Sequence, residues 1–236
     1  MQNGHSQGSS GSYNVVFTTI FGKYDELRPP QVVDANFRYI CFSDEERSVS
    51  PWETIVLPRQ HIAPRRDSRT VKWLPHLYLP GAAVSLYHDA ACYPKTLPTH
   101  LVENWLSSHD IAAYANPFRD CVYDEGATCI QYKADDPAVI RQQMDLYKDR
   151  SYPAHNGLAM TGIFLRRHTP AVAQFNESVW AMISRYSYRD QLSMDYVLWT
   201  MDMPYNRLPP ASFWDTVERF PHNEGTKWSQ WGEEWF

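Results

Sequence analysis

Short apolar, β-branched runs alternate with stretches of helical periodicity along most of this chain, and this alternation restricts the fold more than any other feature of the sequence. Residues 14–20, for example, are almost all β-branched or aromatic, as expected of a strand buried on both faces of a sheet. Strands that alternate with helices predict an α/β sheet. We expect strands over residues 14–20, 37–42, 53–57, 83–88, 110–114 and 157–165, and helices over 65–79 and from about 97, 136 and 169 onward.

Prolines mark where several of these helices begin or end. Asp136-Pro137 and Thr169-Pro170 each place a capping side chain before a proline at the first helical position. Pro75 lies inside the first predicted helix, so we expect that helix to bend or end there. These signals fix the helix boundaries better than periodicity alone does.

The length of 236 residues fits one α/β domain with a substrate-binding extension. Residues 1–12 are rich in Gly, Ser and Gln and predict a disordered or cloning-derived tail. Residues 13–208 would form the domain, and the Trp-rich residues 209–236 a C-terminal closing segment. The chain has no G-x-G-x-x-G motif and no P-loop, so Rossmann dinucleotide binding and P-loop chemistry lack their phosphate loops.

Composition excludes some classes of function. A net charge of −5 argues against general binding to a phosphate backbone. Aromatic residues make up 14% of the chain, a richness that often accompanies stacking on sugars or bases. The four cysteines have no ligand-like spacing and are typical of buried thiols in a reducing compartment. No apolar run approaches the length of a membrane span, and we expect a cytoplasmic protein.

The most informative motif is Tyr87-His88-Asp89, where a buried strand delivers a carboxylate at its C-terminal end. Open α/β sheets bind ligands in the crevice at that edge. A carboxylate placed there could hold Mg²⁺ or Mn²⁺ against a diphosphate, with Tyr87 and His88 beside the same ligand. The alternative is an aspartate that only caps the next turn.

A basic stripe lies just before this strand. Arg65, Arg69, Lys72 and His76 are spaced by four, three and four residues, so they share one face of the predicted helix. Arginine forks and lysine point charges are the groups that recognise phosphate. A charged face turned to solvent is the competing interpretation.

Three further polar clusters are candidates. Asp190, Gln191 and the neighbouring Arg189 follow an amphipathic helix, and Asp190 is either a base, a carboxylate that binds sugar hydroxyls, or a helix cap. Asp195 lies about one turn further on and could support it. His155-Asn156-Gly157 could bind hydroxyl groups, although a turn explains Asn-Gly equally well. In the C-terminal loop, His222 could be a metal ligand and Lys227 a phosphate contact, or the loop is structural.

Together these segments resemble the TOD/MUCI-type glycosyltransferase-like family. The resemblance rests on the segments that run from Val15 to Asp25 and from Tyr39 to Asp44, on Arg69-Thr70-Val71-Lys72, on Tyr87-His88-Asp89-Ala90, and on the later segments 162–168 and 189–193. It implies a GT-A fold, a Rossmann-like nucleotide-binding sheet with flanking helices and a C-terminal extension on the acceptor side. It also implies transfer of a sugar from a nucleotide sugar, such as a UDP- or GDP-sugar, with Mn²⁺ or Mg²⁺.

The resemblance assigns roles to particular residues. The loop with Thr19, Phe21, Tyr24 and Asp25 would receive the nucleotide, and Asp89 would hold the metal. Asp190 and Gln191 would lie under the donor sugar. The segment with His222 and Lys227 is similar to a closing segment of other GT-A enzymes, in which the His binds the metal and the Lys the diphosphate. Tyr87 stands where the family of GT-A enzymes has the first Asp of a D-x-D motif.

Several alternatives stay open at this point. A catalytically degenerate sugar- or nucleotide-binding module fits the replacement of that first Asp by Tyr87. A sugar-phosphate nucleotidyltransferase shares the architecture but usually carries a Gly-rich, basic loop after the first strand. Here that loop has one glycine, Gly22, and one lysine, Lys23, which only weakly supports this alternative. The acceptor (a glycan, protein, lipid or modified nucleic acid) and the retention or inversion of configuration are not predicted.

Overall fold

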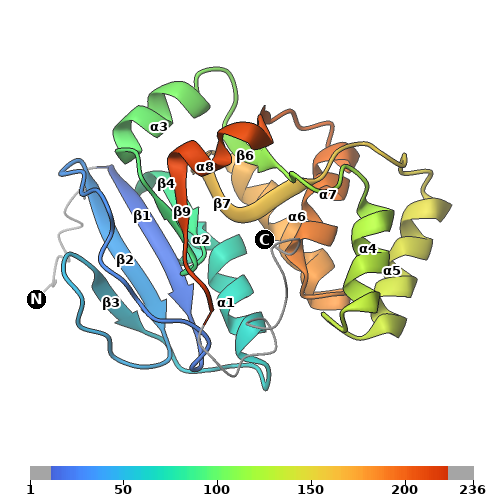
Figure 1. The fold of residues 1–236 in the computed structure, drawn as a ribbon, viewed down its shortest axis with the longest axis horizontal. Helices are drawn as coiled ribbons and strands as arrows, with labels where there is room; N and C mark the ends of the chain where they lie inside the picture. Colours follow the sequence, from blue (N-terminus) through green and yellow to red (C-terminus); the bar gives the residue numbers. More distant parts are fainter. Residues whose placement is uncertain (1–11, 223–236) are drawn as a thin grey trace, which may run out of the picture.

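The computed structural model describes residues 12–222, which form helices around a seven-stranded sheet (Figure 1). The strands of this sheet are β1 (Tyr13–Ile20), β2 (Phe37–Ser43), β3 (Glu53–Val56), β4 (Ala82–His88), β6 (Ile111–Ala115), β7 (Ala159–Arg167) and β8 (Asn206–Leu208). A second sheet pairs β5 (Cys92–Pro94) with β9 (Val217–Arg219). The predicted strands are therefore confirmed, with ends displaced by at most two residues.

The strand order is β3-β2-β1-β4-β7-β6-β8, and every pair is parallel except the two that involve β7. The chain builds β1, β2 and β3 outward in one direction and then returns to add β4 on the other side of β1. The sheet therefore has a topological switch point between β1 and β4. This Rossmann-like, GT-A-like architecture is the predicted fold class.

Helices cover both faces of the sheet. They are α1 (Pro64–Trp73), α2 (Pro75–Tyr78), α3 (Pro98–Trp105), α4 (Val122–Gln131), α5 (Pro137–Asp149), α6 (Pro170–Arg185), α7 (Met194–Thr200) and α8 (Phe213–Thr216), with short 3-10 helices over Asp190–Leu192 and Pro210–Ser212. Side chains of α1 and of α4 to α7 pack against one face, whereas α3, α8 and the β5–β9 pair cover the other.

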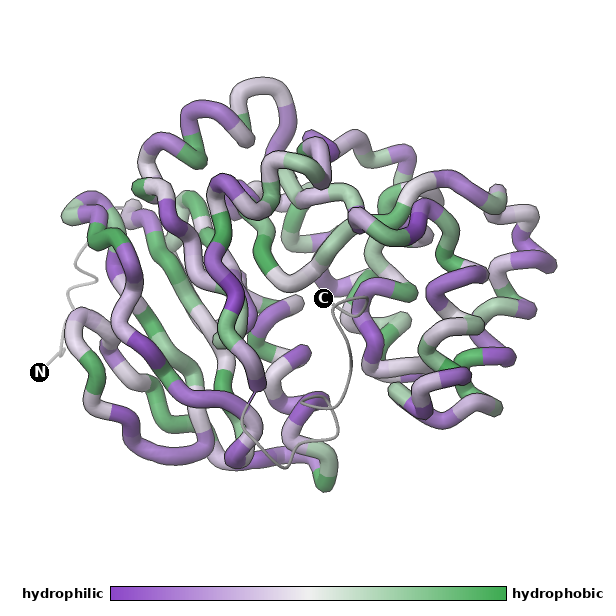
Figure 2. Tube along the Cα trace, in the orientation of Figure 1, coloured by the Kyte–Doolittle hydropathy of each residue, from purple (hydrophilic) through white to green (hydrophobic). Residues whose placement is uncertain are grey.

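The period of two along the strands separates two buried clusters. In β1, Val15 and Phe17 belong to the cluster under α1, and Val16 and Ile20 to the cluster under α3. The strands accordingly carry hydrophobic residues on both faces, and the tube in Figure 2 has green, hydrophobic stretches along the strands of the sheet. A sheet that is covered on both sides leaves the edge at its strand ends as the place for a ligand.

Local signals placed the helix boundaries correctly. The Asp136 side chain accepts a hydrogen bond from the Ala138 amide at 2.8 Å, and Thr169 accepts one from Val172 at 3.3 Å. The first predicted helix ends at Trp73, and α2 begins at Pro75, as the proline predicted. No helix among residues 12–222 has the length and apolar character needed to cross a membrane.

The structure contains elements that the sequence did not predict and corrects one predicted helix face. Residues 122–131 form α4, and residues 206–208 and 217–219 form short strands. His76 does not extend the basic stripe of α1, because the helix breaks before Pro75 and the His76 ring instead lies 3.2 Å from Glu177.

Candidate active site

A cavity opens where β1 and β4 end, at the topological switch point of the sheet. Its walls come from the segment after β1, from α1, from the segments before and within α4, from β7 and from residues 188–191. Open α/β sheets bind ligands in this crevice. The lining includes the sequence-predicted residues Thr19, Phe21, Tyr24, Asp25, Arg65, Arg69, Asp89, Arg189, Asp190, Gln191 and His222.

Asp89, the first residue after β4, borders the cavity with its carboxylate. Oδ1 accepts a hydrogen bond from the Tyr87 hydroxyl at 2.5 Å, and the Asp89 amide donates to the Gly162 carbonyl at 2.7 Å. A Cβ added at Gly162 would lie 3.6 Å from Oδ2, so this second oxygen lies directly beside the backbone of β7. The Tyr87 hydroxyl therefore orients the Asp89 carboxylate.

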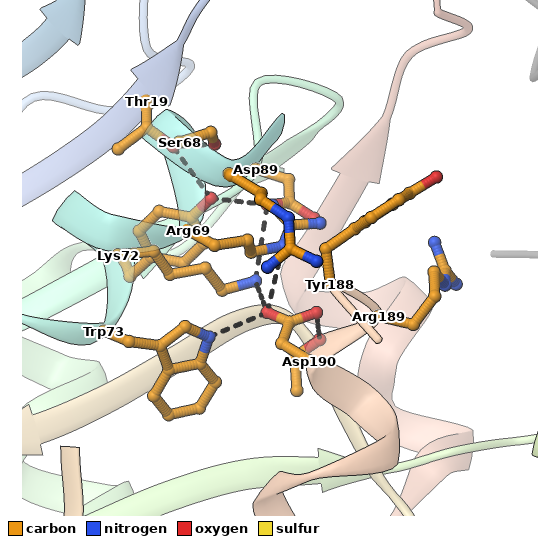
Figure 3. Close-up of polar contacts among 12 residues, drawn as sticks. Thr19, Ser68, Arg69, Lys72, Trp73, Asp89, Tyr188, Arg189 and Asp190 are labelled. Atoms are coloured by element: carbon orange, nitrogen blue, oxygen red, sulfur yellow. Dashed lines mark hydrogen bonds and ion pairs between the residues drawn. The ribbon is translucent and has the colours of Figure 1, made fainter. Parts of the chain in front are cut away.

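Two cations of α1 connect Asp89 to Asp190 (Figure 3). Lys72 Nζ lies 2.7 Å from Asp190 Oδ2 and 3.6 Å from Asp89 Oδ1. Arg69 approaches the same two carboxylates at 3.4 Å and 3.9 Å. The Lys72 side chain is 0% exposed and that of Arg69 15%, which rules out the interpretation of this part of the stripe as a solvent-facing surface.

Asp190 is the most heavily contacted carboxylate of this group. Besides the two cations, its oxygens accept hydrogen bonds from Trp73 Nε1 at 3.0 Å and from Thr161 Oγ1 at 3.1 Å (Figure 3). Burial by itself would raise the pKa of Asp190, but Arg69 and Lys72 outweigh that effect and hold the pKa well below its ordinary value. The helix-cap interpretation of this side chain is wrong, since it caps no helix and points into the cluster.

The loop after β1 forms the opposite side of the cavity. The Tyr24 ring lies between the guanidinium of Arg65, 4.8 Å from its centroid, and the His222 ring, also at 4.8 Å. His222 Nδ1 is 2.7 Å from Asp25 Oδ1. Thr19 Oγ1 is hydrogen-bonded to Ser68 at 2.7 Å. This loop therefore offers an aromatic ring and polar groups next to the cluster of Asp89.

A third wall of the cavity was predicted only in part, since Arg189 was a candidate and the two residues opposite it were not. Arg119, Glu125 and Arg189 line the cavity, and Glu125 Oε2 lies 2.7 Å from Arg119 Nε while its Oε1 is 4.0 Å from Arg189. Glu125 is 1% exposed and lies on α4. The exposed Phe118 is at the same wall. The spacing of Arg119 and Glu125 matches no recognised motif, so the sequence carries no signal for these two residues.

Some predicted residues lie elsewhere. His88 is fully buried, packs against Trp52 and Tyr93, and has its pKa lowered to about 4 by burial, so it is a neutral core residue on the other face of β4. His155 and Asn156 are not among the residues that line the cavity, nor is the buried Gly157. Asp195 is buried and accepts from Tyr205 and the Ala159 amide. Lys227 lies outside the described residues.

Comparison with known proteins identifies a family for this chain. A family model described as TOD1/MUCI70, glycosyltransferase-like domain, matches residues 41–219. The chain belongs to this family. A search of curated proteins found no match to the chain. The TOD1/MUCI70 match begins in β2 and ends with β9, so it includes Arg69, Asp89 and Asp190 but not the loop after β1.

Membership of the TOD1/MUCI70 family makes the chain glycosyltransferase-like and points to a transferase that has a sugar donor and an acceptor. It is compatible with a divalent ion. Among residues 12–222, Asp89 belongs to no group of three or more His, Cys, Asp or Glu side chains arranged around a common point. The carboxylate of Asp89 nevertheless fits Mg²⁺ or Mn²⁺, because such ions are commonly held by one or two carboxylates together with substrate phosphates and water.

Proposed function

We propose that this protein transfers a sugar from a nucleotide-sugar donor to an acceptor and that the donor binds in the cavity at the switch point. The observation that carries the proposal is the cluster of Arg69, Lys72, Asp89 and Asp190 at the ends of β1 and β4. Family membership supports the same class of reaction. The donor would be a UDP- or GDP-sugar, with its base toward Tyr24 and its diphosphate toward Asp89.

The chemistry of the leaving group explains why this cluster matters. A nucleoside diphosphate departs with concentrated negative charge, and fixed cations that are already in place stabilise that charge without reorganisation. Arg69 supplies a donor fork held by two carboxylates, and Lys72 a buried point charge next to it. Burial lowers the pKa of Lys72, while Asp190 and Asp89 act in the opposite direction.

We further propose that Asp89 holds a divalent ion when the donor is bound. Such an ion would supply additional positive charge for the departing diphosphate. Within the protein, Tyr87 fixes Oδ1 of Asp89, and Oδ2 lies beside Gly162 at the cavity. His222 is a second proposed ligand, although its Nδ1 already contacts Asp25, so binding through the other ring nitrogen would be needed.

Asp190 and Gln191 have different proposed roles. A carboxylate whose pKa is held well below its ordinary value is a weak proton acceptor, so Asp190 is poorly suited to act as a general base. We propose that Asp190 positions Arg69 and Lys72 and that Gln191, which is partly exposed in the cavity, contacts the sugar. Arg189, which lines the cavity, remains a proposed acceptor contact. His155, Asn156 and Gly157 do not line it, so we propose that they contact only an acceptor that extends beyond the cavity. The four described cysteines are free and buried, which is typical of a reducing, cytoplasmic environment.

The test is a thermal-shift panel of nucleoside diphosphates and nucleotide sugars, with and without Mn²⁺, followed by a turnover assay on any ligand that binds. Saturation at about 100 times Kd should stabilise the protein by about 2.7 kcal/mol. A Mn²⁺-dependent shift with turnover supports the proposal. Binding without hydrolysis or transfer would instead favour a degenerate binding module, for which Tyr87 in place of an acidic residue is the supporting observation. An unresponsive panel would contradict donor binding.

A further inference from the structure

A second group of ligand-type side chains lies outside the cavity. Cys121, Asp124 and His155 each present one ligand atom, and these atoms all lie within 4.8 Å of one another. Cys121 is buried, whereas Asp124 and His155 are exposed. None of the three lines the cavity that we assign to the donor. The group therefore needs a separate explanation.

Two distant segments bring these side chains together. Cys121 is the N-cap residue of α4, where its side chain makes no capping hydrogen bond, and Asp124 follows in the first turn of the helix. Residues three apart lie on one face of a helix, so both side chains can address one point. His155 comes from the loop before β7 and has a φ of 54°. The Gly157 amide donates to the Asp120 carbonyl at 2.8 Å and holds that loop beside the start of α4.

A carboxylate orients the His155 ring. Nδ1 of His155 lies 2.7 Å from Asp120 Oδ1. Because a carboxylate only accepts hydrogen bonds, Nδ1 carries the proton, and in the neutral ring Nε2 keeps the lone pair that a metal requires. Histidines that bind metals usually donate their other nitrogen to a carboxylate or carbonyl in this way. Asp120 thus has the position of a supporting residue for a ligand.

We propose that Cys121, Asp124 and His155 form a binding site for a zinc-type divalent cation, with Asp120 as the residue that positions His155. Thiolate, imidazole and carboxylate are the ligands that Zn²⁺ uses, whereas Mg²⁺ and Mn²⁺ favour oxygen ligands and are poorly served by a thiolate. The chemistry of this site therefore differs from that of Asp89. Three protein ligands leave a fourth position for water.

Such an ion would have a structural effect on the donor cavity. It would join the start of α4 to the loop before β7, and residues 116–119 connect this site directly to the third wall of the cavity. The Asn116 amide already donates a hydrogen bond to the Leu158 carbonyl at 2.7 Å, so the segment before α4 and the segment before β7 are joined at this second point as well. An ion at Cys121 would hold Arg119 and Glu125 in place from outside the cavity.

Titration of the metal-free protein with Co²⁺ tests the proposal without any activity assay. A Co²⁺–thiolate bond gives a charge-transfer band in the near ultraviolet, and we expect this band to saturate at one ion per chain. Cys121→Ser should abolish the band, and His155→Ala and Asp124→Asn should weaken Co²⁺ binding at least tenfold. His109→Ala and Asp145→Asn, at a partly exposed and an exposed position outside the group, are the matched controls and should bind as the wild type does.

Two results would overturn the inference. One is the absence of a thiolate band in the wild type. The other is a band that survives Cys121→Ser or is unaffected by both His155→Ala and Asp124→Asn, since Co²⁺ would then be bound elsewhere. If Cys121→Ser does not fold, the two exposed variants still decide the question. Asp89→Asn should leave the Co²⁺ band unchanged, so loss of donor binding and loss of this site can be told apart.

Discussion

The carboxylate of Asp89 has few partners within the protein, whereas that of Asp190 is surrounded by them, and this difference separates their expected roles. Asp89 is one-third exposed in its side chain (31%), while the Asp190 side chain is 4% exposed. A group that must contact a ligand needs accessible atoms, and a group that positions others needs fixed contacts. Substitution of Asp89 should therefore affect ligand binding, and substitution of Asp190 should affect the stability of the fold.

Asp89→Asn should weaken Mn²⁺-dependent donor binding by at least about tenfold, because contacts to charged groups contribute about 1.5–3 kcal/mol. Calorimetric titration of a nucleotide sugar with and without Mn²⁺ measures this loss. Tyr87→Phe is the matched control, since it removes the hydrogen bond to Asp89 but retains the carboxylate. Donor affinity that is equally dependent on Mn²⁺ in Asp89→Asn and in the wild type would disprove a metal role for this residue.

Asp190→Asn should destabilise the folded protein by about 3–5 kcal/mol, because it removes the closest anion from the buried Lys72. The folded-state pKa of Asp190 is depressed, so its contribution is fully present above the unfolded-state pKa of about 3.9 and is lost as the pH falls below that value. We expect the free energy of unfolding in urea to fall less between about pH 6 and about pH 3 in the variant than in the wild type. Equal acid sensitivity of the two proteins would contradict the assignment.

At the scale of elements, the sequence predicted what depends on neighbouring residues. Capping residues and prolines placed α5 and α6, and β-branched runs placed β1, β2 and β4. α4 was missed because its start has no capping side chain and Gly126 interrupts its pattern. That glycine has a tertiary reason: a Cβ there would lie 2.9 Å from Met144 Sδ on α5.

The turn before β7 offers a test of backbone strain. Gly157 has a φ of 93°, and a Cβ there would lie 1.8 Å from Arg207 Nη1. Gly157→Ala should cost about 1–3 kcal/mol from the backbone conformation, plus the displacement of Arg207 from its ion pair with Asp195. Thermal unfolding of Gly157→Ala, Arg207→Ala and the double variant separates the two effects. If the double variant were as stable as Arg207→Ala alone, the clash and not the φ angle would be the cause.

At the scale of the whole molecule, the site combines groups that no local pattern connects. Asp190 bonds to Trp73, 117 residues before it, and His222 contacts Asp25, 197 residues before it. The sequence could identify Arg69, Lys72, Asp89 and Asp190 as candidates, since each lies in a motif or on one helix face. It could not identify Arg119 and Glu125, because their place in the cavity depends on how α4 packs against the 3-10 helix at Asp190.

Because the cavity is lined from both halves of the sheet, donor binding should leave a distributed pattern of protection. We expect a nucleotide sugar with Mn²⁺ to slow amide hydrogen exchange in residues 21–25, 89–92 and 188–191, and an acceptor or sugar bound at the third wall to extend protection to residues 119–125. Helix α3 packs on the other face of the sheet and serves as the internal control: its amides that exchange by local opening should be unaffected, whereas amides that exchange only by global unfolding should slow throughout the protein as the ligand stabilises it. Protection of locally exchanging amides in 119–125 alone, or to the same extent in α3 as at the cavity, would contradict donor binding beside Asp89. The cluster around Asp89 would then have a structural role only, because its charges balance one another without a ligand.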